Sequence, residues 1–134
     1  MTLDENKLLV RRYLAALSGR EKPASVVDRF VADAKLRRHI AAMEIAFPLY
    51  RIDAEDLIAE NDRVVVRTTL RGTHQGDFMS TPPTGREVAV PMVAVFRVAG
   101  GKIVDSWFSA DTLGLLYQIG VLSAPPDALP YPNP

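Results

Sequence analysis

The chain has 134 residues, of which 48% are hydrophobic, 24% are charged and none is cysteine. This length suits one domain with a real core, and the absence of cysteine excludes disulfides and cysteine-ligated metals. The 16 basic residues balance the 16 acidic ones, so nothing predicts attraction to nucleic acid or to an anionic membrane. The first residues lack the basic start and apolar run of a signal peptide, and no apolar stretch approaches the roughly 20 residues of a membrane span. We therefore expect a soluble cytoplasmic protein.

Helical periodicity dominates the first third of the sequence. Thr2 and Glu5 fit a capping box, which predicts the start of a helix. Pro23 suits the first turn of a second, short helix, and Pro48 ends a third, because proline disfavours helix in the residue before it. The apolar spacing places these helices at residues 4–18, 23–30 and 36–47.

After Pro48 the pattern becomes alternating. Arg63, Arg67 and Arg71 share one face of a predicted strand whose other face is apolar. Pro91 indicates a bulge or an edge position in the next strand, and the glycine pair that follows this strand favours a hairpin. Strands are predicted at residues 51–60, 63–73, 87–98 and 102–108, with a last helix at 113–119. Helices followed by antiparallel strands predict an α+β domain over residues 1–120, and the proline-rich residues 121–134 form a tail.

Three stretches of the chain together carry a family likeness. They read DLIAENDRVVVR at 56–67, GTHQGDF and PTGR within 72–86, and, within 95–120, a segment that contains Trp107, Asp111 and GLLYQIG. In order and spacing they resemble the SnoaL-like polyketide cyclases, or ester cyclases, of the nuclear transport factor superfamily.

The resemblance implies a cone: a curved antiparallel sheet around a small-molecule pocket, with the N-terminal helices packed over its concave face. Family members close polyketide rings by aldol condensation, with a carboxylate as acid/base and with no metal or organic cofactor. The resemblance also implies a small hydrophobic ligand and a homodimer through the outer sheet face. The segment between the second and third helices is shorter than in the family, so part of the pocket wall is expected to be missing or rebuilt.

Asp111 matches the position of the family's catalytic aspartate. Trp107, Ser109 and Asp111 alternate along one strand, so Ser109 and Asp111 face the interior if Trp107 does. An interior carboxylate among apolar groups suits proton abstraction beside a carbonyl. The alternative is that Asp111 caps the last helix, since aspartate is favoured at that position. Both roles can coexist.

Other side chains are candidates for ligand binding. Trp107 could stack on a flat substrate or belong to the core. Tyr13 could donate a hydrogen bond to a substrate oxygen, or be a half-buried structural residue. His39 could assist binding or simply lie at the boundary of the third helix's apolar stripe. His39 and His74 are far apart and lack a carboxylate cluster, so no metal site is expected.

These observations leave three functions open. The first is a cofactor-free cyclase or isomerase-type enzyme that acts on a small hydrophobic carbonyl compound through Asp111. The second is a non-catalytic binding or accessory protein with the same pocket. The third is another reaction in that pocket, such as isomerisation or epoxide hydrolysis. A cavity into which Asp111 opens would favour an enzyme, whereas an outward-facing Asp111 that serves only as a cap would favour the binding protein.

Overall fold

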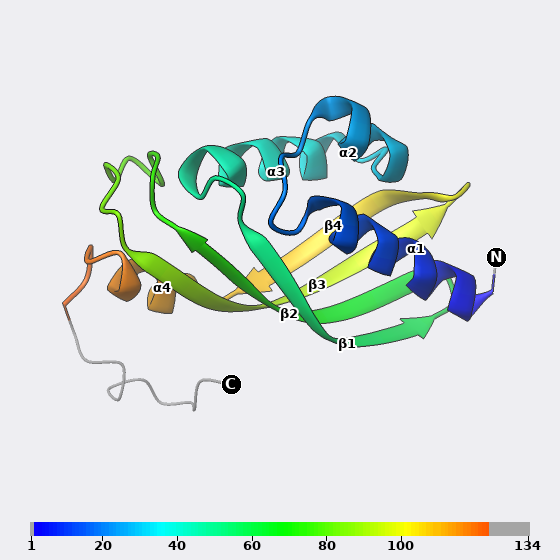
Figure 1. The fold of residues 1–134 in the computed structure, drawn as a ribbon. Coiled ribbons are helices and arrows are strands. Elements are labelled where there is room, and N and C mark those ends of the chain that lie inside the picture. Colours follow the sequence, from blue (N-terminus) through cyan, green and yellow to red (C-terminus); the bar gives the residue numbers. More distant parts are fainter. Residues whose placement is uncertain (1, 124–134) are drawn as a thin grey trace.

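A computed structural model describes residues 2–123. Four helices and four strands are found in this part of the chain (Figure 1). They are α1 (Leu3–Leu17), α2 (Ala24–Phe30), α3 (Ala34–Ala46), β1 (Arg51–Glu60), β2 (Arg63–Thr73), β3 (Glu87–Ala99), β4 (Lys102–Ala110) and α4 (Thr112–Gln118). The predicted elements are all present, within a few residues of their expected ends.

The helix ends follow local chemistry. The Glu5 amide donates to the Thr2 hydroxyl at 3.1 Å and the Thr2 amide donates to the Glu5 carboxylate at 3.3 Å, which is the expected capping box. Pro23 occupies the N-cap of α2 rather than its first turn. Asp33 caps α3 by accepting a hydrogen bond from the Lys35 amide.

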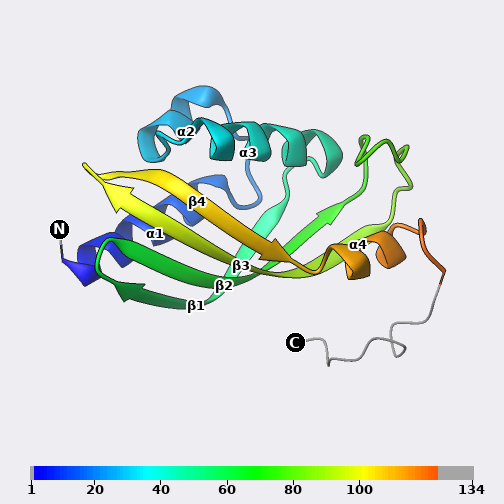
Figure 2. The ribbon, with the colours of Figure 1, turned by 180° about the vertical axis from the view of Figure 1, so that it is seen from behind.

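The strands form one antiparallel sheet in the order β1-β2-β3-β4. Helices α1, α2 and α3 lie on one side of this curved sheet, as both views show (Figures 1 and 2). Alternate residues of β2, from Val64 to Leu70, face these helices and are buried, while the intervening positions, with Arg63, Arg67 and Arg71 among them, face outward. The predicted α+β fold, with helices over the concave face, is therefore confirmed.

Pro91 lies where β3 has no neighbour on one side. The last residue of β4, Ala110, pairs with Met92, so β3 continues beyond the end of β4 at Pro91. The Pro91 carbonyl accepts a hydrogen bond from the Asp111 amide at 3.0 Å, so the backbone C=O of Pro91 points toward the β4 side of β3. The backbone nitrogen of Pro91, which carries no hydrogen, points to the same side. The pairing of β3 with β4 has ended there, so no hydrogen bond of the sheet is lost.

A bulge in β4 decides which of its side chains face the core. Ile103 pairs with Val98, but Asp105 pairs with Arg97, so Val104 is an extra residue in the ladder. An extra residue reverses the inside–outside alternation on the two sides of a bulge. Ile103 is buried before it, and Ser106 is buried after it.

The predicted tail at 121–134 lies outside the described residues, apart from residues 121–123. No helix among residues 2–123 is long and apolar enough to cross a membrane. Within the same residues no group of three or more histidine, cysteine, aspartate or glutamate side chains could hold a metal ion.

Candidate functional site

A small cavity lies between α1, α3 and the concave face of the sheet. Its walls are almost entirely apolar or aromatic, with side chains from α1, α3 and all four strands. They are Tyr13, Leu14, Leu36, His39, Ile40, Tyr50, Ile52, Thr68, Leu70, Met92, Ala94, Phe96 and Phe108. The cavity has a volume of about 20 Å³. This is room for about one water molecule.

Aromatic rings line one side of the cavity and reach its edge. Tyr13 packs edge-on against Phe96, with ring centroids 5.6 Å apart, and Phe96 packs edge-on against Phe108 at 5.9 Å. His39 stacks on Phe108 at 4.9 Å, between α3 and the edge strand β4. His39 and Phe108 are both exposed at this edge, so the stack lies between the cavity and solvent.

The cavity environment sets the protonation of its polar side chains. Burial against the stack lowers the pKa of His39, so the imidazole is neutral at pH 7 and can accept a proton. Burial raises the pKa of Tyr13, and the neighbouring Tyr50 adds to this effect, so the Tyr13 hydroxyl remains protonated and can donate. Among residues 2–123 no hydrogen bond holds the Tyr13 hydroxyl or the His39 ring. Both groups are therefore available to a ligand.

A buried ion pair holds the Tyr50 wall of the cavity. The Lys22 ammonium donates to the Glu44 carboxylate at 2.8 Å and to the backbone carbonyls of Arg20 at 2.8 Å and Tyr50 at 3.2 Å. It also lies 4.0 Å from the centre of the Tyr50 ring, as a cation–π contact. Glu44 in turn accepts from the Leu49 amide. Burial, and then the Glu44 charge, raise the pKa of Tyr50.

Asp111 lies away from this cavity. Its carboxylate accepts from the Gly114 amide at 2.8 Å and caps α4, so the capping role weighed from the sequence is confirmed. A side chain at position 114 would collide with that carboxylate, since its Cβ would lie 2.2 Å from one oxygen. Asp111 and Ser109 line a separate hollow on the outer face, with Arg67 and Arg71. The expectation that Asp111 opens into the interior cavity is wrong, whereas its proton-transfer role stays a prediction.

Trp107 also faces outward. It pairs with Val95, whose neighbour Phe96 is the inward-facing residue, and its side chain is 43% exposed. Trp107, Ser109 and Asp111 therefore share one face, as predicted, but the condition that Trp107 faces the interior is not met. The reason is the Val104 bulge, because counting outward from buried Ile103 without the extra residue places Trp107 inside.

The structure brings two of the five predicted site residues, Tyr13 and His39, to the interior cavity. It adds Phe108 and Tyr50, which the sequence analysis did not single out. Phe108 could have been found by placing a bulge in β4. No sequence signal indicated Tyr50, whose ring contacts Lys22, a residue distant in the chain.

The outer sheet face carries an apolar row that crosses all four strands. Ile58 pairs with Val65, Val65 with Val95, and Val95 with Trp107. Ile58 is 64% exposed, and Arg63 stacks over Trp107 at 5.3 Å. Exposed contiguous apolar surface of this kind is typical of an interaction site.

An α+β cone with a small apolar cavity under its helices defines a class of small-molecule pocket proteins. Residues 8–119 match the family described as SnoaL-like polyketide cyclase. This chain belongs to that family.

Solved structures agree with this assignment. AclR from Streptomyces galilaeus, described as a candidate hydroxylase, is 28% identical to this chain, with a TM-score of 0.80. The match covers 95% of this chain and 88% of the AclR chain. A candidate SnoaL-like polyketide cyclase from a Jannaschia species is 27% identical, with 92% and 94% covered and a TM-score of 0.74. TsrD from Streptomyces laurentii shares the fold at 23% identity, with 91% and 99% covered and a TM-score of 0.77. The search of curated proteins found no significant match.

Proposed function

We propose that this protein is a cofactor-independent enzyme of the cyclase or isomerase type, which acts on a small hydrophobic carbonyl compound in the interior cavity. The observation that carries the proposal is that the His39 imidazole and the Tyr13 phenol line the same small, mostly apolar cavity. A base and a hydrogen-bond donor on one small apolar site suit proton abstraction next to a carbonyl group.

In this mechanism His39 takes a proton from the carbon beside the substrate carbonyl. The electron pair of the broken C–H bond forms a carbon–carbon double bond, and the carbonyl oxygen becomes an enolate oxygen. The Tyr13 hydroxyl stabilises that oxygen by a hydrogen bond. For ring closure, the enolate carbon attacks a second carbonyl carbon of the same molecule, and the resulting alkoxide takes the proton back from the imidazolium. For isomerisation, the proton returns to a different carbon.

Substrate entry requires the cavity to enlarge, because its present volume admits about one water molecule. The route runs between α3 and β4, where the His39–Phe108 stack is the barrier. If the His39 and Phe108 rings separated, a substrate that entered between them would meet His39, which is also the proposed base. A small or flat substrate suits this entrance better than a bulky one.

The second candidate is a non-catalytic binding or accessory protein with the same pocket. The observation that favours it is the outward-facing, capping position of Asp111. The family's carboxylate chemistry then has no group in the interior cavity, and only the ligand-binding walls remain. AclR, as a candidate hydroxylase, adds that relatives of this fold are assigned to more than one reaction.

Exchange of carbon-bound hydrogen for deuterium tests the proposal without the natural substrate. The probe is acetophenone, whose methyl protons are followed by proton NMR in D₂O. The wild-type protein is expected to accelerate exchange, and His39→Gln to lower the rate by about a hundredfold, as is usual for a general base. Asp111→Asn keeps the cap and tests the carboxylate that the family resemblance implies; with His39 as the base, it is expected to match wild type.

The opposite result assigns the chemistry elsewhere. Loss of exchange in Asp111→Asn with full exchange in His39→Gln would move the base to the outer hollow, as the family resemblance implies. Exchange no faster than in buffer, together with saturable binding of the ketone, would favour the binding protein.

Assembly through the outer face is part of the proposal. The row Ile58, Val65, Val95 and Trp107 offers a second copy an apolar strip about as wide as the sheet. A two-fold axis that runs along the strands between β2 and β3 would pack Ile58 of one copy against Trp107 of the other. A homodimer would thereby cover the exposed apolar surface.

A further inference from the structure

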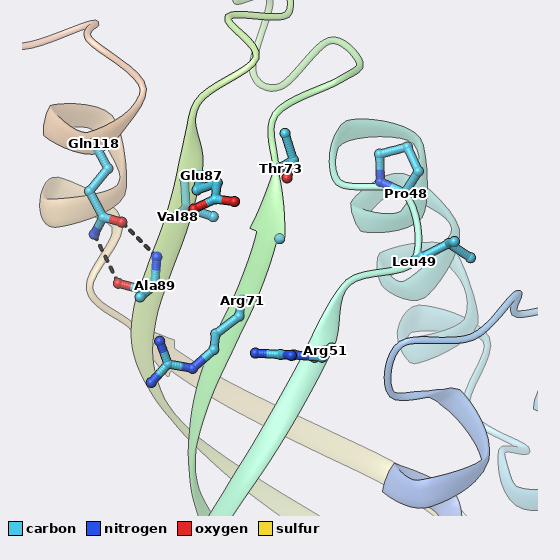
Figure 3. Close-up of a pocket in the computed structure, with 10 residues that line it drawn as sticks. Pro48, Leu49, Arg51, Arg71, Thr73, Glu87, Val88, Ala89 and Gln118 are labelled. Carbon is cyan, nitrogen blue, oxygen red and sulfur yellow. Dashed lines mark hydrogen bonds between the residues drawn. The ribbon is translucent and has the colours of Figure 1, made fainter.

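The outer face also carries a groove at the end of the sheet remote from this apolar row. Its floor is formed by β1, β2 and β3, and its sides by the turn before β1 and by α4 (Figure 3). The hollow has a volume of about 480 Å³. Arg71, on the floor of this groove, lies six residues along β2 from Val65 of the apolar row. At the rise of a strand this separates the two residues by about 20 Å.

Two arginines lie on the floor of this groove, and the Arg71 guanidinium turns away from Arg51, toward β3 (Figure 3). Arg51 and Arg71 are directly paired on neighbouring strands, and the Arg51 guanidinium extends toward Arg71 (Figure 3). Like charges at directly opposed positions destabilise a sheet. Asp53 accepts from Arg71 at 2.9 Å, but Arg51 forms no ion pair with any residue among 2–123. One positive charge is therefore left without a partner in the described part of the chain.

The surrounding structure fixes the position of Arg51. Its Cγ lies 3.3 Å from the point where a side chain at Gly19 would begin, and Gly19 has a φ of +69°. The Gly19 amide donates to the Tyr50 carbonyl at 2.9 Å, just before Arg51 in the chain. The stem of Arg51 thus packs closely against Gly19, where a larger residue would press on it, and this limits the directions in which the guanidinium can point.

The walls of the groove are equally well held. Gln118 donates to the Ala89 carbonyl at 2.9 Å and accepts from the Ala89 amide, so it completes the exposed edge of β3 as a strand would. On the other side, Leu49 is 50% exposed and has a φ of +58°, a backbone conformation that leucine rarely adopts. The Glu44 carboxylate fixes it by accepting from the Leu49 amide at 3.0 Å.

We propose that this groove binds a small organic carboxylate, with the carboxylate on the Arg51 guanidinium, which extends toward Arg71, and the apolar body toward Pro48 (Figure 3). Guanidinium groups match the planar fork of a carboxylate. Glu87 lines the same groove two residues along β3 from Ala89, and Asp53 already neutralises part of Arg71. These two carboxylates balance the two guanidinium groups, so the groove has no excess positive charge for a doubly charged phosphate, and a monoanion is favoured.

The groove lies on the opposite face from the interior cavity, so its test is independent of the proposed activity. The probes are benzoate and inorganic phosphate, titrated at low ionic strength and followed by amide chemical shifts of the full-length protein. Benzoate is expected to bind saturably and to shift the amides of residues 49, 51 and 71. Arg51→Gln is expected to weaken binding by about tenfold or more, as for loss of a charged hydrogen bond.

Three further variants make the result decisive. Arg12→Gln removes the same charge from the exposed side of α1 and is expected to leave benzoate binding unchanged. Arg51→Lys keeps the charge but not the fork, and an intermediate loss is expected. Glu87→Gln removes the opposing charge, and tighter binding is expected. Equal weakening by Arg51→Gln and Arg12→Gln, tighter binding of phosphate than of benzoate, or no saturable binding would overturn the proposal.

Discussion

Removal of the Lys22 ammonium is expected to be among the more costly single changes in this protein. The Lys22 side chain is 1% exposed, and its ammonium has three hydrogen-bond acceptors and the face of the Tyr50 ring around it. In Lys22→Met the stem is retained and these interactions are lost. The Glu44 carboxylate then remains partly buried without its counter-charge.

The magnitude follows from the burial of the remaining partner. Removal of one member of a fully buried ion pair costs about 3–5 kcal/mol. Glu44 is 25% exposed and still accepts from the Leu49 amide, so part of its charge stays solvated or hydrogen-bonded. We therefore expect a loss of about 2–3 kcal/mol in the free energy of unfolding. For a chain of this length this lowers Tm by about 7–11 °C, from an unfolding entropy of about 2.1 cal/mol/K per residue.

Thermal and urea unfolding of the variant measure this loss. Lys7→Met is the matched control, since Lys7 forms an exposed pair with Asp4 at 3.8 Å and a change below about 0.5 kcal/mol is expected. The double variant Lys22→Met/Glu44→Gln is expected to regain part of the stability, because it no longer buries an unpaired charge. If Lys22→Met unfolds at the same temperature as Lys7→Met, the buried pair does not stabilise the Tyr50 wall and the reasoning is refuted.

Three other predictions concern pH, the cap and assembly. Folding lowers the pKa of His39, so the contribution of this residue to stability is complete above its ordinary pKa of 6.5 and is lost as pH falls through the folded-state pKa. The free energy of unfolding in urea should therefore fall with pH in that window, and this fall should be absent in His39→Gln. The exchange rate should rise with pH across the same folded pKa, and a rate independent of pH between 4 and 7 would contradict His39 as the base. Asp111→Ala is expected to cost about 1 kcal/mol through loss of the α4 cap and Asp111→Asn much less, as measured by urea unfolding; equal losses would argue against the cap. Trp107→Lys is expected to convert a dimer to a monomer in light scattering, with Lys102→Ala as the control, and a monomeric wild-type protein would contradict assembly through this row.

The sequence by itself determined the secondary structure and the family. Capping residues such as Thr2 and Asp33 act over three residues or fewer, and the alternation along β2 is written in consecutive positions. Such local signals specify where elements begin and which face of a strand is apolar. They also identified His39 and Tyr13 as candidates, since both lie beside apolar helical stripes.

The tertiary structure alone decided which face of β4 meets the cavity. The Val104 bulge depends on how β4 pairs with β3, and it turns Phe108 inward while Trp107, Ser109 and Asp111 remain outside. The pairing of Arg51 with Arg71, and of Lys22 with Glu44, likewise joins residues 20 or more positions apart. The alternation of side chains along a strand follows from consecutive residues. Which set of side chains faces the core depends on one extra residue in the β3–β4 pairing, and only the packed sheet shows that this residue is Val104.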